Sequence, residues 1–261
     1  MSYRKIELVL NDGVALVRLN EPETLNALST EMSSEVSAAL AELGATARAL
    51  VLTGSARGFC SGARLTGAGM ALGDEGVDVG GALDTHYHPL MRQLRELPIP
   101  WVSAVNGAAA GIGCSLALAA DLIVAGESAY FLQAFRRIGL VPDGGSTFLL
   151  AKAAGRVRAM EMMLLGEKLP AAKALEWGLI NRVVPDAEVE AAAMTLAGEL
   201  AAGPTVALGL IRKAAWAALE SSWDEALDLE RALQRQAGRT NDFLEGVTAF
   251  REKRPARFKG A

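Results

Sequence analysis

Apolar positions near the N-terminus form short runs that fit β-strands. Residues 6–10 and 14–19 are two such runs, and Asn11-Asp12-Gly13 between them is typical of a hairpin turn. Residues 49–53 and 101–105 are apolar at nearly every position, which is typical of strands buried on both faces. The pattern predicts an N-terminal hairpin followed by strands of a covered sheet.

Helical segments alternate with these strands. Residues 28–43 predict a helix with Ser29 as its N-cap, and residues 87–97 predict another. A third helix is expected to begin in the glycine turn after residues 101–105 and to end at Ala120. Short strands are expected at 122–125 and 129–131, and the chain from Gly145 onward is expected to be mainly helical. This alternation predicts an α/β core.

The C-terminal part shows helical periods alone, in residues 207–219, 223–236 and 242–253. It carries large apolar residues and has little sheet of its own to cover. We therefore expect a core over residues 1–200 and a helical oligomerisation region over residues 201–261 that packs on another subunit.

Composition narrows the class of protein. The chain has 261 residues and a formal net charge of -4, and its pI of about 5.4 disfavours general nucleic-acid binding. Its best apolar stretch, residues 101–124, is interrupted by Asn106, three glycines and Asp121, so we expect no membrane span.

Cysteine and histidine are scarce. Cys60 and Cys114 are the two cysteines, and residues 2–7 are too polar for a signal peptide, so we expect reduced thiols in a cytoplasmic protein. His86 and His88 are the two histidines, and they lack a third partner that would make a metal site. We expect no metal.

Two glycine-rich turns each follow a predicted buried strand, at residues 54–65 and 106–115. Neither fits the phosphate-binding loop pattern G-x-x-x-x-G-K-[ST], and neither fits the dinucleotide-binding pattern well. Gly111-Ile112-Gly113 lies where a helix should begin and offers unpaired amides. Two amides from different loops can stabilise one developing oxyanion. The alternative is that these glycines serve tight turns and close helix packing alone.

Several ordered motifs resemble the crotonase, or enoyl-CoA hydratase/isomerase, superfamily over essentially the whole chain. The matching segments are residues 19–28, 58–63, 106–121, 139–147, 171–181 and 250–260. The resemblance implies a spiral of ββα units with a helical trimerisation region, and trimers that often pair into hexamers. It also implies an acyl-CoA thioester as substrate, with CoA as part of that substrate and no separate cofactor.

The resemblance also implies roles for particular residues. It assigns the oxyanion hole to the backbone N–H groups of Ala63 and Ile112. The pantetheine and adenine site would be lined by Ala27, Ser61, Ala63 and Leu65, and Phe258 and Lys259 would approach the CoA nucleotide. Lys259 belongs to a basic tail, and a solvated helix end is the alternative for that tail, which consists of Arg251, Lys253, Arg254, Arg257 and Lys259.

The chain departs from typical hydratases of the superfamily at the two positions where those enzymes carry glutamates. Ser115 and Phe135 stand there instead, and neither can act as a general base. The motif at residues 139–143 most resembles the epoxyphenylacetyl-CoA isomerase branch of phenylacetate degradation. That resemblance implies that Asp143 is the base.

One carboxylate is sufficient for a double-bond shift, because it can remove a proton from one carbon and return it to another. An apolar pocket near Phe135 would raise the pKa of Asp143. The alternative for Asp143 is an N-cap before a helix at residues 146–150.

Arg64, where the family commonly has aspartate, could meet a CoA phosphate, a substrate carboxylate or solvent. The acyl specificity would depend on the loop at residues 66–90.

Three functions remain open at this point. The favoured one is an acyl-CoA isomerase that shifts a double bond, or rearranges an epoxidised ring, in aromatic or fatty acyl-CoA catabolism. The alternatives are an enoyl-CoA hydratase with relocated acids and a non-catalytic acyl-CoA-binding protein. A homo-trimer or hexamer is expected, without nucleic acid or membrane partners.

Overall fold

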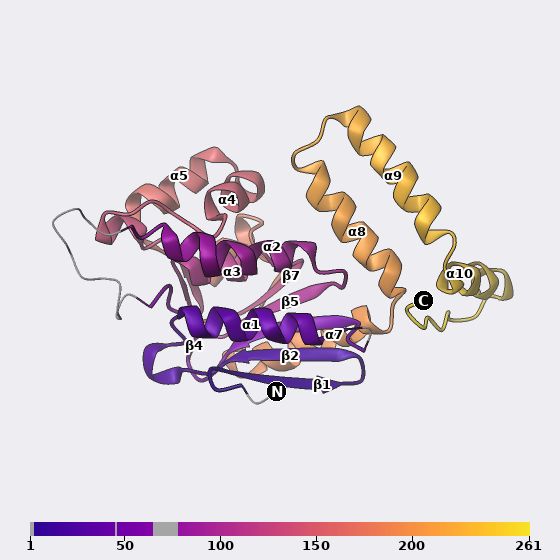
Figure 1. Cartoon of the computed structure of the whole chain (residues 1–261), viewed down its shortest axis with the longest axis horizontal. Helices are drawn as coiled ribbons and strands as arrows, with labels where there is room; N and C mark the ends of the chain where they lie inside the picture. The colour runs from indigo at the N-terminus through magenta and orange to yellow at the C-terminus, as the bar shows by residue number, and fades with distance from the viewer. Residues whose placement is uncertain (1–2, 45, 65–77) are drawn as a thin grey trace.

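The computed structural model describes residues 3–44, 46–64 and 78–261, which form two β-sheets with helices around them (Figure 1). The larger sheet has the order β1-β2-β3-β5-β7-β10. β1 and β2 form the expected antiparallel hairpin, and the later neighbours are parallel. Its strands are β1 (Ile6–Asn11), β2 (Val14–Leu19), β3 (Ala49–Gly54), β5 (Trp101–Val105), β7 (Leu122–Gly126) and β10 (Arg182–Val184).

The smaller sheet has the order β4-β6-β8-β9. Successive strands alternate between the sheets, so β3 is followed by β4, β5 by β6 and β7 by β8. This is the repeated unit of the expected spiral, and the α/β fold class is confirmed. The strands are β4 (Gly58–Cys60), β6 (Ala108–Ala110), β8 (Tyr130–Leu132) and β9 (Lys168–Pro170).

Helices cover both faces of the larger sheet. α7 (Val189–Ala201) packs on one face, where its apolar side chains meet those of β2, β3, β5 and β7. The other face holds the larger core, which includes Trp101, Phe59 and Phe131. The helices on that side are α1 (Thr30–Glu42), α2 (His88–Glu96), α3 (Ile112–Leu118), α4 (Ser146–Ala154), α5 (Arg156–Leu165) and α6 (Ala171–Glu176).

The start of α1 follows the sequence prediction. The Ser29 hydroxyl accepts a hydrogen bond from the Met32 amide at 3.1 Å, which satisfies an amide that has no partner within the helix. The short strands β4, β6, β9 and β10 were not predicted. β4 and β6 lie inside the two glycine-rich turns, and residues from 145 onward, which include β9 and β10, were expected to be mainly helical.

The three expected C-terminal helices are present and stand to one side of the sheets in Figure 1. They are α8 (Thr205–Ala218), α9 (Trp223–Ala237) and α10 (Asn241–Glu252). Arg212 joins α8 to the core. Its buried guanidinium pairs with Asp121 at 2.5 Å and donates to the main-chain carbonyls of Leu94 and Leu97.

Among the described residues, no single helix has the length and hydropathy needed to cross a membrane. One bent pair, Asp186–Ala201 with Thr205–Ala218, meets those two criteria when taken together.

Candidate active site

The two glycine turns meet at the ends of neighbouring parallel strands. Gly62 follows β4 and Gly111 follows β6, and these strands pair through Gly58 with Ala108. Both glycines have positive φ, 115° and 53°. A Cβ at Gly111 would lie 3.6 Å from the Cα of Gly62. The two turns are therefore in contact. The backbone amides of Ala63 and Ile112, which directly follow Gly62 and Gly111, lie in the same region of the molecule.

The bridge between Leu28 and Ala63 leaves the Ala63 amide without a hydrogen-bond acceptor among the described residues. Leu28 forms a parallel bridge with Ala63, in which its amide donates to the Gly62 carbonyl and its carbonyl accepts from the Arg64 amide. A residue bridged in this way directs its own N–H to the opposite side. No described residue accepts a hydrogen bond from the Ala63 amide.

The Ile112 amide is the second backbone N–H group without an acceptor among the described residues. Ile112 is the first residue of α3, so its N–H has no acceptor within the helix. It also donates to no other described residue. Gly113, the next residue, allows this turn to press on β4, because a Cβ there would lie 2.7 Å from the Cys60 Cβ. Two neighbouring turns thus each carry an amide without an acceptor among the described residues, and the binding of one oxygen by both amides stays a prediction.

Asp143 lies against the same turn of α3. The Ser115 hydroxyl donates to the Asp143 main-chain carbonyl at 2.9 Å. The neighbouring Gly144 is so close to α3 that a Cβ on it would lie 2.9 Å from the Ser115 Cβ and 3.0 Å from the Ile112 Cγ1. The structure thus brings Asp143, Ser115 and Ile112 together.

The Asp143 carboxyl group is in an unusual state. Its Oδ1 atom is buried and has no hydrogen-bond partner among the described residues. Burial without a compensating partner raises the pKa of Asp143 to about 6. A carboxylate with a pKa in this range can both remove and return a proton near neutral pH.

The N-cap alternative for Asp143 is wrong. The N-cap of α4 is Gly145, and no side chain caps that helix. The main-chain carbonyl of Asp143, and not its side chain, accepts a hydrogen bond from the Ser146 amide. The Asp143 carboxyl group therefore does not cap α4.

Phe135 lies at the Gly111 turn. Its ring is buried, and a Cβ on Gly111 would lie 3.8 Å from its Cζ atom. Phe135 and Ser115 therefore both border the site, and neither supplies an ionisable group.

Tyr87 is a site residue that the sequence reasoning did not single out. It ends the π-helical turn before α2, and its buried hydroxyl donates to the Leu28 carbonyl at 2.9 Å. Its pKa is raised, first by burial and then by the nearby charge of Asp143. A single aromatic residue at the start of a predicted helix gives no sequence signal for this contact.

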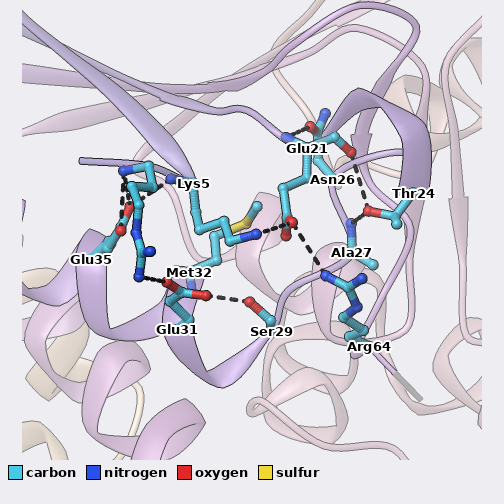
Figure 2. A network of polar contacts seen from close by, with 11 residues as sticks. Lys5, Glu21, Thr24, Asn26, Ala27, Ser29, Glu31, Met32, Glu35 and Arg64 are labelled. Carbon is cyan, nitrogen blue, oxygen red and sulfur yellow. Dashed lines mark hydrogen bonds and ion pairs between the residues drawn. The ribbon is translucent and has the colours of Figure 1, made fainter. Parts of the chain in front are cut away.

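Ala27, Ser61 and Arg64 contact the loop at residues 21–24, and Figure 2 shows how Ala27 and Arg64 lie in their polar network. The Ser61 hydroxyl donates to the Thr24 carbonyl at 2.7 Å, and the Ala27 amide donates to the Thr24 hydroxyl at 3.2 Å. These contacts hold the loop that carries Leu28.

Arg64 points to Glu21, 3.2 Å away, and Lys5 lies 2.5 Å from the same carboxylate oxygen (Figure 2). Its guanidinium is thus partly neutralised by a protein carboxylate. A contact of Arg64 with a CoA phosphate or a substrate carboxylate stays a prediction.

Other expected binding residues lie elsewhere. Phe258 and Lys259 sit beside α10: the Phe258 ring faces Gly246, and the Lys259 amide donates to Asp242 at 2.7 Å. A role for them at the CoA nucleotide stays a prediction. Leu65 lies outside the described residues, as do residues 66–77 of the loop at residues 66–90 that was expected to set the acyl specificity.

A cavity of about 690 Å³ lies away from this site, between α8 and the core, and is bordered by Arg95, Lys213 and Trp216 among others. In the described part of the chain, no three His, Cys, Asp or Glu side chains gather in a way that could hold a metal ion.

Two sheets that exchange successive strands, with helices outside and a helical C-terminal region, define a crotonase-type α/β fold. The chain belongs to the enoyl-CoA hydratase/isomerase family, whose sequence profile matches residues 10–261.

Curated relatives in this family carry two kinds of name. The chain is 46% identical over 260 residues to a probable enoyl-CoA hydratase of Rhodobacter capsulatus, covering 100% of both chains. It is 45% identical over 250 residues to the 1,2-epoxyphenylacetyl-CoA isomerase of Escherichia coli, covering 95% of both. A solved enoyl-CoA hydratase of Bacillus anthracis superposes with a TM-score of 0.92 at 30% identity, covering 99% of this chain and 100% of that one.

Proposed function

We propose that this enzyme is an acyl-CoA isomerase that shifts a double bond, or rearranges an epoxidised ring, through an enolate. The observation that carries the proposal is Asp143, whose neighbour Gly144 packs against Ile112. Its carboxyl group has a buried oxygen without a hydrogen-bond partner among the described residues, and its pKa is raised to about 6. The flanking positions Ser115 and Phe135 supply no second carboxylate.

The proposed reaction begins with proton removal next to the thioester carbonyl or at the allylic carbon. Asp143 takes this proton, and the electron pair moves onto the thioester oxygen to form a dienolate. The amides of Ala63 and Ile112 donate to that oxygen, and each such donor is typically worth about 3–4 kcal/mol in the transition state. Asp143 then returns the proton to the other carbon, which re-forms the thioester carbonyl with the double bond moved.

A single carboxylate is enough for this cycle. No atom is gained or lost from the substrate, so no water has to be activated. Hydration would require a positioned water and both a base and an acid for its addition. The proposed site has one group that can hold the proton between the two steps, which favours isomerisation.

The acyl group is the less constrained part of the proposal. The isomerase named after 1,2-epoxyphenylacetyl-CoA shares 45% identity with this chain, which supports an aromatic or unsaturated acyl-CoA substrate.

We also propose a trimer or hexamer, because α9 and α10 leave large apolar side chains such as Trp223 and Phe250 exposed in the single chain.

Hydration is the second candidate, since the 46% identical relative from Rhodobacter capsulatus is named a probable enoyl-CoA hydratase. In that case a water would have to be activated by Asp143 alone. This candidate differs from the first in its product, which contains one water more than the substrate.

A turnover screen with enoyl-, dienoyl- and epoxyphenylacetyl-CoA tests the proposal, with products resolved by mass. We expect products of unchanged mass from at least one substrate. Products heavier by one water, formed faster than any isomer, would replace the proposal with a hydratase. Binding of CoA esters by calorimetry with no turnover on any substrate would indicate a non-catalytic protein.

A further inference from the structure

The main-chain carbonyl of Asp143 accepts three hydrogen bonds. The Ser115 hydroxyl donates at 2.9 Å, the Ser146 hydroxyl at 2.9 Å and the Ser146 amide at 3.1 Å. Both serine side chains are completely buried. A carbonyl with two lone pairs is thus surrounded by more donors than it needs.

Ser115 and Ser146 differ in what else they contact. The Ser146 hydroxyl also lies 3.2 Å from the Gln133 side-chain oxygen, and its one proton cannot serve both acceptors at once. The Ser115 hydroxyl donates to Asp143, its acceptor within the described part of the chain. Ser115 is therefore the dedicated donor.

Ser115 also links the base to the oxyanion donor. It lies three residues after Ile112 on α3, so both project from one turn of the same short helix. Gly144 closes the gap, since a Cβ on it would be too near both side chains. The distance between the Asp143 segment and the Ile112 amide is therefore set by a single helical turn.

This contact holds the base without touching its carboxylate. A donor to the carboxylate would stabilise its charged form and make it a weaker base. A donor to the main-chain carbonyl restrains the segment and leaves Oδ1 without a hydrogen-bond partner in the described part of the chain. Position and basicity are thus controlled by different atoms of one residue.

We propose that Ser115 is a positioning residue for the isomerisation, which holds the Asp143 main chain at a fixed place relative to the Ile112 amide. The inference rests on the proposed function, in which Asp143 is the base.

Ser115→Ala tests this role. The carbonyl keeps its Ser146 donors, so the variant leaves no buried acceptor unpaired. We expect kcat to fall by about 10- to 100-fold with KM within about threefold, because a misplaced base slows chemistry more than binding. The acid limb of the kcat profile should also move below pH 6 as water reaches the carboxylate. Tyr87 is the titratable group whose pKa is coupled to the charge of Asp143, and its pKa is raised.

Ser103→Ala is the matched control. Ser103 is equally buried, and its hydroxyl donates at 2.9 Å to the carbonyl of Ala117, which is also on α3. A loss that reflects general loosening of α3 would appear in both variants. We expect kcat and its acid limb in Ser103→Ala to match the unchanged enzyme.

An NMR titration of carboxyl-labelled aspartate provides a readout that does not depend on turnover, with the Asp143 signal assigned from Asp143→Asn. We expect its pKa to be lower in Ser115→Ala than in the unchanged protein. If Ser115→Ala matches Ser103→Ala in kcat and leaves the Asp143 pKa in place, the role of Ser115 is overturned while the base assignment stands. If Asp143→Asn retains isomerase activity, the proposed function fails and the role of Ser115 fails with it.

Discussion

The Tyr87 hydroxyl donates a 2.9 Å hydrogen bond to the main-chain carbonyl of Leu28. That carbonyl also accepts from the Arg64 amide, so Tyr87 joins the segment before α2 to the bridge that carries Ala63. The turn that carries Ala63 is thus held from a second side by a residue distant in sequence.

Tyr87→Phe should weaken this support without unfolding the protein, because Leu28 keeps its bond from Arg64. We expect the free energy of unfolding to fall by about 1 kcal/mol, the usual contribution of one hydrogen bond. We expect kcat to fall several-fold, because the Ala63 amide loses part of its restraint. Denaturant unfolding and steady-state kinetics measure both. Tyr130→Phe is the control, and equal effects in the two variants would contradict the link to Ala63.

Gly62→Ala should damage catalysis more than stability. Gly62 has φ 115°, and a Cβ there would lie 3.2 Å from the Ala110 carbonyl oxygen, so the turn must shift. We expect a loss of about 100-fold in kcat, as for removal of one oxyanion donor. Gly178→Ala is the control, since Gly178 also has a positive φ, 75°, and no atom of the described residues lies within 4 Å of the added Cβ. Equal kcat in the two variants would show that the Gly62 turn does not position a catalytic amide.

Asn26→Ala should be strongly destabilising. The buried Asn26 side chain donates to the carbonyls of Ser55 and Gly58, and it accepts from the Glu21 amide and the Ser55 hydroxyl. Its φ of 56° also lies in a region that alanine disfavours. We expect a loss of about 3 kcal/mol in thermal or denaturant unfolding.

Asn20→Ala provides the comparison for Asn26→Ala. Asn20 makes an exposed hydrogen bond to Glu7 at 3.1 Å, and surface changes of this kind usually cost under about 0.5 kcal/mol. A similar loss in both variants would mean that the buried network contributes little.

Much of the fold follows from apolar periodicity. The hairpin at residues 6–19 and the buried strands β3 and β5 are long enough, and apolar enough, for their pattern to be read. β6 is Ala108-Ala109-Ala110, which has no branched or aromatic residue and lies within a glycine turn. β9 and β10 have three residues each, too few for any period. These strands exist because the neighbouring strands pair with them.

The candidate site was predictable in part. The glycine turns pointed to backbone donors, and the resemblance indicated which amides they are. The contact between Gly62 and Gly111 depends on strand pairing between residues about 50 positions apart, which local pattern does not show. Tyr87 was missed for the same reason, since its hydroxyl acts across the fold. The raised pKa of Asp143 comes from burial that depends on the packed chain.

Asp143→Asn should stabilise the protein above pH 6 and leave its stability unchanged near pH 3.5. The folded-state pKa is raised from 3.8 to about 6, so ionisation above that pH costs free energy that the unfolded chain does not pay. Below about pH 4 the group is protonated in both states and the cost disappears. Since the side chain is half-buried, we expect a gain of about 1–2 kcal/mol at pH 8.

Asp186→Asn should change stability in the opposite direction. Hydrogen bonds from Ser128 hold the pKa of Asp186 below its usual value. That stabilisation is present above the unfolded pKa and is lost as the pH falls, so the variant should be less stable than the unchanged protein at pH 8. Chemical unfolding at pH 8 and pH 3.5 measures both variants. A loss of stability in Asp143→Asn at pH 8 would contradict the pKa of Asp143 being raised by burial.

Solvent deuterium exchange into an enoyl-CoA tests the central claim most directly, because it reports proton removal whether or not the double bond moves. The unchanged enzyme should exchange hydrogen next to the thioester or at the allylic carbon, as followed by mass spectrometry. Asp143→Asn should bind the CoA ester equally well by calorimetry and lose exchange by about 100- to 10,000-fold. Exchange and isomerisation by Asp143→Asn at the rate of the unchanged enzyme would show that another group is the base.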